Sequence, residues 1–192
     1  MSFYLIVIGA ADVLLFVLGI LYTDYAWWQS VLGVVLATVG VIALDGLTAW
    51  LIRLLPERWF DVSHRMGAGR REVRFYRTIG IRRWKEKIPE LGCFTNFSKS
   101  RVEQPTDASY LCRYIMECHY GVVIHLCNAL VGALIPVCQP LRPLWLFALP
   151  VTVINAVLSL LPLFVLRYNL PKLLYLYERA LRKSSNKETV FK

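Results

Sequence analysis

"LWLFALPVTVINAVLSLLPLFVL", residues 144–166, runs for 23 residues without a charged side chain. About 20 consecutive apolar residues are enough to cross the hydrocarbon core of a bilayer as a helix. The stretch therefore predicts a membrane-spanning helix. Three other stretches of similar length and character predict three more spans, at residues 3–22, 29–54 and 120–138.

The composition of the whole chain agrees with four spans. Hydrophobic residues make up 57% of the 192 residues and charged residues 18%, with a mean hydropathy of +0.49. Soluble domains are less apolar and carry more charge. We expect an all-α integral membrane protein that forms a single membrane domain over residues 1–192. No basic residue precedes the run at 3–22, so we interpret it as a span of the mature protein rather than a signal peptide.

The distribution of basic residues predicts the topology. Of the 22 Lys and Arg residues, 13 lie in an insert at 56–118 and 7 at 167–192, whereas the connector 23–28 has none. Basic flanks of membrane spans stay in the cytoplasm. The sequence thus predicts a multi-pass protein of the cell membrane with cytoplasmic N- and C-termini. Anionic lipid headgroups explain the net charge of +9 more simply than nucleic acid, which is not an expected partner.

Two segments outside the spans have a helical pattern. Residues 71–88 predict a basic amphipathic helix that lies at the membrane interface, with Asp107 as the N-cap of a later helix that continues into the third span. Residues 168–183 predict a C-terminal surface helix with Pro171 in its first turn. For both, a purely structural role and a substrate-facing role remain open.

Each predicted span carries a polar residue at a similar depth. Counted at 1.5 Å per residue, Asp12, Asp45, His125 and Asn155 lie roughly 8–18 Å below the inner surface. Ionisable groups inside a membrane are costly and normally face the interior of a helix bundle, where they mark function. The alternative is a structural network that fixes helix packing. His125 is a suitable base because its unperturbed pKa lies near neutral pH.

The five cysteines predict neither a disulfide framework nor a metal site. No two of them have C-x-x-C spacing. Cys118 and His119 also have no second pair of Cys or His residues at the sequence spacing of a zinc site. We therefore expect no metal and no bound cofactor.

Several short elements then resemble a known family. These are Pro56 and Phe60 after the second span, "RRWKEKIPELG" at 82–92, Glu117 eight residues before His125, and "RYNLPKL" at 167–173. Over about residues 54–183 the chain resembles the glycosyl-4,4'-diaponeurosporenoate acyltransferase family of small membrane proteins. The resemblance implies transfer of a fatty acyl group to a hydroxyl of a membrane-embedded sugar lipid. It carries over the following residues: Trp84, Lys85, Glu117, His125, Arg167, Tyr168, Asn169 and Pro171.

The residues suit a direct transfer from an acyl-thioester donor. No G-x-S-x-G or H-x-x-x-x-D motif is present, so a covalent serine mechanism lacks support. We assign His125 as the base, oriented by Glu117 or Asp45. A second group would bind substrate, with the basic members receiving the donor's phosphates: Arg82, Arg83, Trp84, Lys85, Arg167, Tyr168 and Asn169.

Two other functional classes fit the sequence. One is a non-catalytic lipid-binding partner or scaffold of a glycolipid-synthesis enzyme, for which the polar residues of the spans affect folding only. The other is a small transporter, which four spans would form only as a dimer. Membrane lipids and an acyl donor are the expected partners, and a homo-oligomer is left open.

Overall fold

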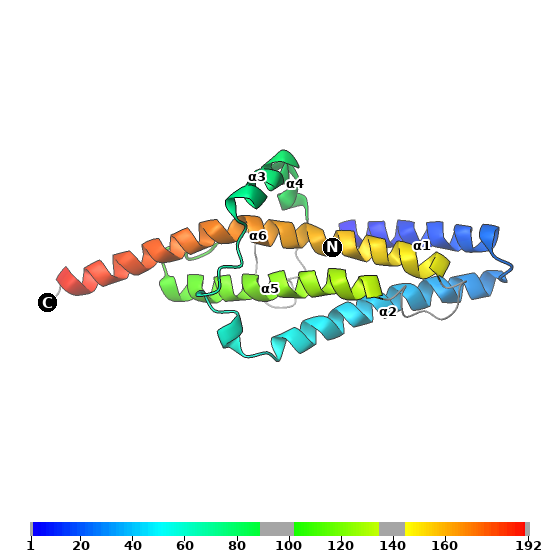
Figure 1. The fold of residues 1–192 in the computed structure, drawn as a ribbon, viewed down its shortest axis with the longest axis horizontal. Coiled ribbons are helices and arrows are strands. Elements are labelled where there is room, and N and C mark those ends of the chain that lie inside the picture. The colour runs from blue at the N-terminus through cyan, green and yellow to red at the C-terminus, as the bar shows by residue number, and fades with distance from the viewer. Residues whose placement is uncertain (1, 89–101, 135–144, 191–192) are drawn as a thin grey trace. The chain divides into compact units, whose positions relative to one another are not determined.

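The computed structural model describes residues 2–88, 102–134 and 145–190 (Figure 1). Within these ranges the chain contains helices and loops but no strand. Four helices in the described ranges are long and apolar enough to cross a membrane: Tyr4–Tyr22, Trp27–Arg53, Ala108–Gly132 and Phe147–Ser184. The predicted all-α fold with four spans is confirmed. Residues 135–138 of the predicted third span lie outside the described residues.

The chain forms two compact units, each of which combines distant segments. The first contains Met1–Ile52 and Ile124–Leu161, and the second contains Arg53–Val123 and Pro162–Lys192. The long helices α5 (Ala108–Leu134) and α6 (Trp145–Val190) therefore contribute to both units. The single membrane domain stays a prediction.

Helices α1 (Ser2–Tyr22) and α2 (Trp27–Arg53) of the first unit form an antiparallel hairpin (Figure 1). Asp12 faces Thr38, and Gly19 faces Ser30. The buried core of the hairpin also includes Phe147 from the beginning of α6.

Two glycines let α6 approach the hairpin closely. A Cβ atom on Gly19 would lie 2.9 Å from the Phe147 ring, and one on Gly33 would lie 3.1 Å from it. Small residues at helix contacts allow this kind of close packing in membranes. Phe147 is consequently almost fully buried between the two helices.

The outer faces of α1 and α2 are apolar. Leu5, Ile6 and Leu36 are 65%, 68% and 62% exposed. A helix with apolar residues on its outer as well as its inner face is suited to a lipid environment. The exposed leucine and isoleucine side chains thus support the assignment of both helices as membrane spans.

The second unit contains short helices beside the long ones. These are η1 (Glu57–Trp59), α3 (Arg70–Thr78), α4 (Ile81–Trp84) and η2 (Lys85–Lys87). Buried residues recur on α5 at helical spacing, from Leu111 through Ile115 to His119. Asp107 caps α5 as predicted, since its carboxylate accepts a hydrogen bond from the backbone N–H of Ser109 at 2.8 Å.

The predicted single helix over 71–88 is wrong. Helix α3 ends at Thr78, and Gly80 adopts a left-handed conformation with φ of 68° before α4 begins. Glycine tolerates this conformation and commonly ends helices in it. The segment is therefore two short basic helices joined at Gly80.

The predicted separate C-terminal helix at 168–183 is also wrong, because α6 continues without interruption from Trp145 to Val190. Pro171 has no N–H to donate to the carbonyl of Arg167 four residues earlier. The backbone N–H of Ala68 donates to that carbonyl instead, at 2.9 Å. Substitute partners of this kind let a long helix pass through a proline.

Candidate functional site

A carboxylate and an amide meet in the first unit. Nδ2 of Asn155 on α6 donates a hydrogen bond to Oδ1 of Asp45 on α2, at 3.3 Å. The contact places these two residues at the same level of their helices, and their depth in the membrane stays a prediction. The same Nδ2 also packs against α5, because a Cβ atom on Gly132 would lie 2.9 Å from it. Asn155 is thus held between α2 and α5.

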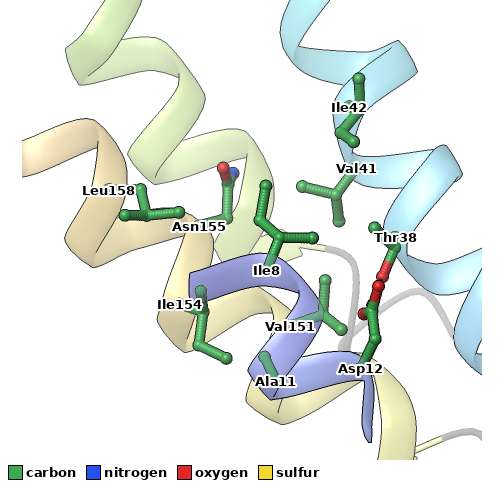
Figure 2. A pocket seen from close by; sticks show the side chains of 10 residues that line it. All are labelled: Ile8, Ala11, Asp12, Thr38, Val41, Ile42, Val151, Ile154, Asn155 and Leu158. Carbon is green, nitrogen blue, oxygen red and sulfur yellow. Dashed lines mark hydrogen bonds between the residues drawn. The ribbon is translucent and has the colours of Figure 1, made fainter. Parts of the chain in front are cut away.

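A small, partly open cleft of about 50 Å³ lies beside Asn155 in the first unit. Figure 2 shows its walls, which come from α1, α2 and α6. Asp12 also lines the cleft, and its carboxylate accepts a hydrogen bond from the Thr38 hydroxyl at 2.7 Å. The other lining residues are apolar: Ile8, Ala11, Val41, Ile42, Val151, Ile154 and Leu158.

His125 and Asn128 lie on the part of α5 that belongs to the first unit. His125 is half-buried, and Asn128 is 7% exposed. Within the described part of the chain, Oδ1 of Asn128 has no hydrogen-bond partner. A buried amide oxygen without a partner can accept a hydrogen bond from a ligand hydroxyl. The orientation of His125 by Asp45 or Glu117 stays a prediction.

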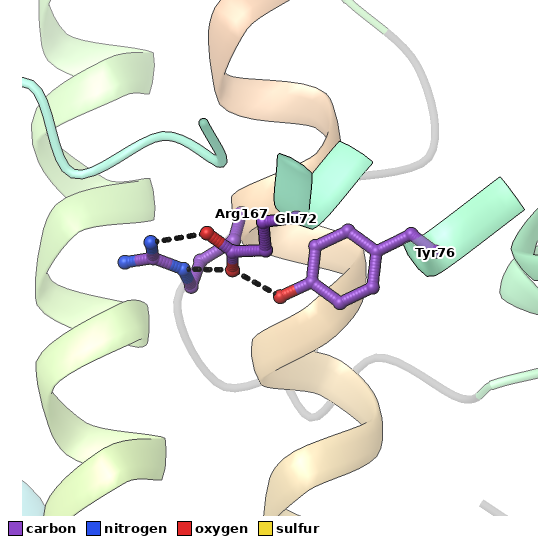
Figure 3. A network of polar contacts seen from close by, with 3 residues as sticks. All are labelled: Glu72, Tyr76 and Arg167. Carbon is purple, nitrogen blue, oxygen red and sulfur yellow. Dashed lines mark hydrogen bonds and ion pairs between the residues drawn. The ribbon is translucent and has the colours of Figure 1, made fainter. Parts of the chain in front are cut away.

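The second unit holds an ion pair that the sequence did not predict. Nε and Nη2 of Arg167 donate to the two carboxylate oxygens of Glu72, at 2.6 and 2.7 Å (Figure 3). The Tyr76 hydroxyl donates to the same carboxylate. The only signal in the sequence is the four-residue spacing of Glu72 and Tyr76 on one helix face.

This ion pair changes the expected role of Arg167. The hydrogen bond from Arg167 is the main cause that lowers the pKa of Glu72 to about 2. Burial, followed by the bond to Glu72, raises the pKa of Tyr76, so its hydroxyl remains a donor. The Arg167 charge is balanced by Glu72, and a donor phosphate would have to displace that carboxylate. Arg167 fits a positioning role better than direct phosphate binding.

Residues 82–85 and 167–172, which are far apart in the sequence, meet in this unit. Nε of Arg82 donates to the hydroxyl of Tyr168 at 3.1 Å, although 86 positions separate the two residues. Trp84 packs against the buried cluster that contains Tyr168, and its indole N–H donates to the carbonyl of Ile79 at 3.0 Å. The Lys172 ammonium lies 4.7 Å from the Tyr168 ring centroid. "RRWK" and "RYNLPK" therefore build one basic, aromatic surface.

The other predicted residues of this surface differ in burial. Arg83 is exposed, whereas Lys85 and Asn169 are half-buried. Their contact with substrate stays a prediction.

His119 is a buried histidine. In the sequence it stands out only beside Cys118, as part of a metal site that the residue spacing excludes. It is 0% exposed, and its Nδ1 lies 2.9 Å from the carbonyl oxygen of Phe60 and 3.1 Å from that of Asp61. Donation from Nδ1 to these carbonyls leaves Nε2 as an acceptor. Among the described residues Nε2 has no partner. The histidine thus fixes the 60–61 loop to α5.

Glu117 is paired with an arginine in the second unit. Nη2 of Arg53 lies 3.0 Å from Oε2 of Glu117, and the Arg53 guanidinium lies 5.6 Å from the Tyr120 ring centroid. A role for Glu117 as the orienting group of a base would require it to act from this ion pair.

Residues 56–179, well over half of the chain, match the family of glycosyl-4,4'-diaponeurosporenoate acyltransferases. The chain belongs to that family. It is an acyltransferase with helices able to span the membrane. No curated protein and no solved structure matches the chain.

The matched region of this acyltransferase includes the Arg82–Tyr168 contact, the Glu72–Arg167 pair and both His119 and His125. Asp45 lies outside it. Among the described residues, no three His, Cys, Asp or Glu side chains are grouped so that they could hold a metal ion. The matched residues offer a base, hydrogen-bond donors and cationic groups, which are the requirements of acyl transfer to an alcohol.

Proposed function

We propose that this acyltransferase esterifies a sugar hydroxyl of a membrane-embedded glycolipid, a carotenoid glycoside or a similar sugar lipid, with a fatty acyl group from a thioester donor. The hydroxyl oxygen attacks the thioester carbonyl carbon, and the base takes the hydroxyl proton. The carbon–sulfur bond breaks, the ester forms, and the thiolate receives the proton and leaves as a thiol. Atoms and charge balance without a cofactor.

The donor's phosphates bind to the basic, aromatic surface of the second unit. The observation that supports this assignment is the Arg82–Tyr168 hydrogen bond, which joins the basic segment 82–85 to α6 within the matched region. Arg82 and Arg83 are exposed and positively charged, and Lys85 follows Trp84 directly. Arginine and lysine are the usual partners of phosphate groups. Arg167 acts through Glu72 as a positioning residue.

His125 acts as the base that takes the proton of the acceptor hydroxyl. It lies in a span where a titratable ring is costly unless it has a function. Asn128, three residues further along the same helix, has an amide oxygen without a partner among the described residues, and this oxygen can accept a hydrogen bond from a hydroxyl. Asp45 or Glu117 orients the ring. General base catalysis contributes about 10²- to 10⁴-fold to the rate of such a step.

Both termini and the basic surface lie in the cytoplasm. The distribution of Lys and Arg around the spans supports this orientation. A soluble thioester donor, which carries its phosphates in water, would reach the basic surface from that side.

The test is acyl transfer by the purified protein in liposomes that contain glycosyl-4,4'-diaponeurosporenoate. A long-chain acyl-thioester is added, and the released thiol and the new ester are both measured. The proposal predicts one thiol for each ester formed. Ester formation from liposome phospholipid without added thioester would show that the donor is not a thioester. Thiol release without ester formation would show that the sugar lipid is not the acceptor.

A further inference from the structure

We propose that Arg77, Arg82 and Lys172 form an anion site around the hydroxyl of Tyr168, and that this site takes a phosphate monoester. The inference rests on the proposed function, in which the basic, aromatic surface receives the donor's phosphates. It adds two ligands, Arg77 and Lys172, and names the kind of phosphate that is bound. All four residues belong to the second unit.

Three cationic side chains meet at one aromatic ring. Nε of Arg82 donates a hydrogen bond to the Tyr168 hydroxyl at 3.1 Å, and the guanidinium of Arg77 also interacts with this hydroxyl. The Lys172 ammonium, from the next turn of α6, lies over the same ring at 4.7 Å from its centroid. Tyr168 is only 3% exposed, so its ring is held in place by packing. The three cations therefore converge on one fixed point.

The turn at Gly80 brings the two arginines to this point. Arg77 lies in the last turn of α3 and Arg82 in α4, and between them Gly80 has a φ of 68°. Ile81 is 0% exposed and belongs to the same buried cluster as Tyr168. The backbone that carries both arginines is thus anchored beside the ring.

Within the described part of the chain, the three cations have no carboxylate partner. The ion pairs found there involve other basic residues. Glu72, the acidic residue of α3, already accepts hydrogen bonds from Arg167 and from Tyr76. Like charges that lie close together repel each other, and a bound anion removes this repulsion. The cluster therefore favours an anionic ligand.

The charge of the cluster distinguishes between kinds of phosphate. A monoester carries a charge of about −1.5 to −2 at pH 7 and has three free oxygens as acceptors. A diester has a single charge and fewer free oxygens. Two guanidinium groups and one ammonium group can contact all the oxygens of a monoester. A nucleotide thioester such as acyl-coenzyme A carries a 3′-phosphate monoester, whereas a carrier-protein thioester is linked through a diester. A phosphatidic acid headgroup is also a monoester.

The experiment uses the full chain in nanodiscs of phosphatidylcholine and measures the binding of coenzyme A and of 3′-dephospho-coenzyme A by calorimetry. The two probes differ only in the monoester. We expect the dephospho compound to bind the wild type about tenfold more weakly, since it lacks hydrogen bonds to charged groups.

Two variants and a control assign the difference to the cluster. Arg77→Ala and Lys172→Ala should bind coenzyme A about tenfold more weakly than the wild type and should bind the two probes nearly equally. Both side chains are exposed, so these substitutions leave the core unchanged. Lys183→Ala removes another exposed charge of α6 and should behave like the wild type.

Equal affinity of the wild type for the two probes would overturn the inference, as would an equal loss of binding in Lys183→Ala. Acyl transfer from the thioester by a protein that binds both probes equally would reject the monoester site and leave the proposed function intact. A second set of nanodiscs contains phosphatidic acid. If the wild type binds neither nucleotide but enriches this lipid, and Lys172→Ala does not, the monoester site stands with a lipid headgroup as its ligand. That result would reject the binding of the donor's phosphates at this surface.

Discussion

The backbone N–H of Ala68 donates to the carbonyl oxygen of Arg167 at 2.9 Å, where Pro171 leaves that carbonyl without a partner within α6. A loop thereby completes the hydrogen bonding of a long helix. The same residue, Arg167, uses its side chain to hold Glu72 of α3. Backbone and side chain of one arginine thus attach both the loop and the short helices of the second unit to α6.

Close packing at Gly67 is needed for this attachment. A Cβ atom there would lie 3.0 Å from Cδ of Pro171 and 3.3 Å from Cβ of Leu170, neither of which can move easily. We expect Gly67→Ala to lower the free energy of unfolding by about 1–3 kcal/mol, the usual range for overpacking. Thermal unfolding in detergent measures the change. Gly69→Ala is the control, because no atom lies within 4 Å of the added Cβ, and equal effects at both positions would reject the explanation.

The Glu72–Arg167 pair predicts that the fold loses stability in acid. The folded-state pKa of Glu72, about 2, is below the ordinary value of 4.5, so the pair stabilises the fold fully above pH 4.5. This stabilisation is lost as the pH falls from 4.5 toward 2. We expect Glu72→Gln to destabilise the protein by about 1–3 kcal/mol at pH 7, between the values for exposed and buried pairs.

The pH dependence separates this pair from other acid effects. Thermal stability of Glu72→Gln should fall less steeply than that of the wild type between pH 4.5 and 2. Parallel curves for the two proteins would show that Glu72 does not titrate as its contacts imply. Arg167→Lys should also be destabilised at pH 7, since lysine cannot make the two-point contact.

The Arg82–Tyr168 contact predicts an effect on donor binding. We expect Arg82→Ala to raise the KM for the acyl-thioester about tenfold, because a charged partner of phosphate is removed. Tyr168→Phe should cause a smaller rise, since it removes only the hydroxyl that orients the guanidinium. Arg74→Ala removes an exposed positive charge on α3 and serves as the control. An equal tenfold rise in Arg74→Ala would indicate general electrostatic attraction rather than a site.

The contacts of His119 predict a structural role rather than a catalytic one. Asparagine can reproduce the Nδ1 donor of histidine but has no group at the Nε2 position. We expect His119→Asn to keep most of the stability and activity, and His119→Ala to lose about 1–3 kcal/mol through the unsatisfied carbonyls of Phe60 and Asp61. Unfolding curves and acyl transfer rates measure both. A folded but inactive His119→Asn would make His119, rather than His125, the leading base.

The sequence predicted features that depend on distance along one helix. The four spans follow from apolar length, and the similar level of Asp45 and Asn155 follows from counting residues along each span. The cap at Asp107 is equally local. Each of these can be counted from the residues without knowing which helices are neighbours.

Features that depend on the partner of a residue were missed. Glu72 and Arg167 are 95 positions apart, and no periodicity links α3 to α6. The continuity of α6 through Pro171 depends on a donor from Ala68, which the pattern around the proline does not contain. Gly80 is an exception, because a glycine two residues past the end of α3 is a signal for a helix end that is visible in the sequence.

The central claim is acyl transfer with His125 as the base. The most direct measurement is the mass of the sugar lipid in cells that make glycosyl-4,4'-diaponeurosporenoate and express wild type, His125→Ala, or His64→Ala, the last being an exposed histidine used as a control. We predict that the lipid gains an acyl group with wild type and His64→Ala, and that the gain falls at least 100-fold with His125→Ala at equal protein level. Full acylation by His125→Ala would contradict the account.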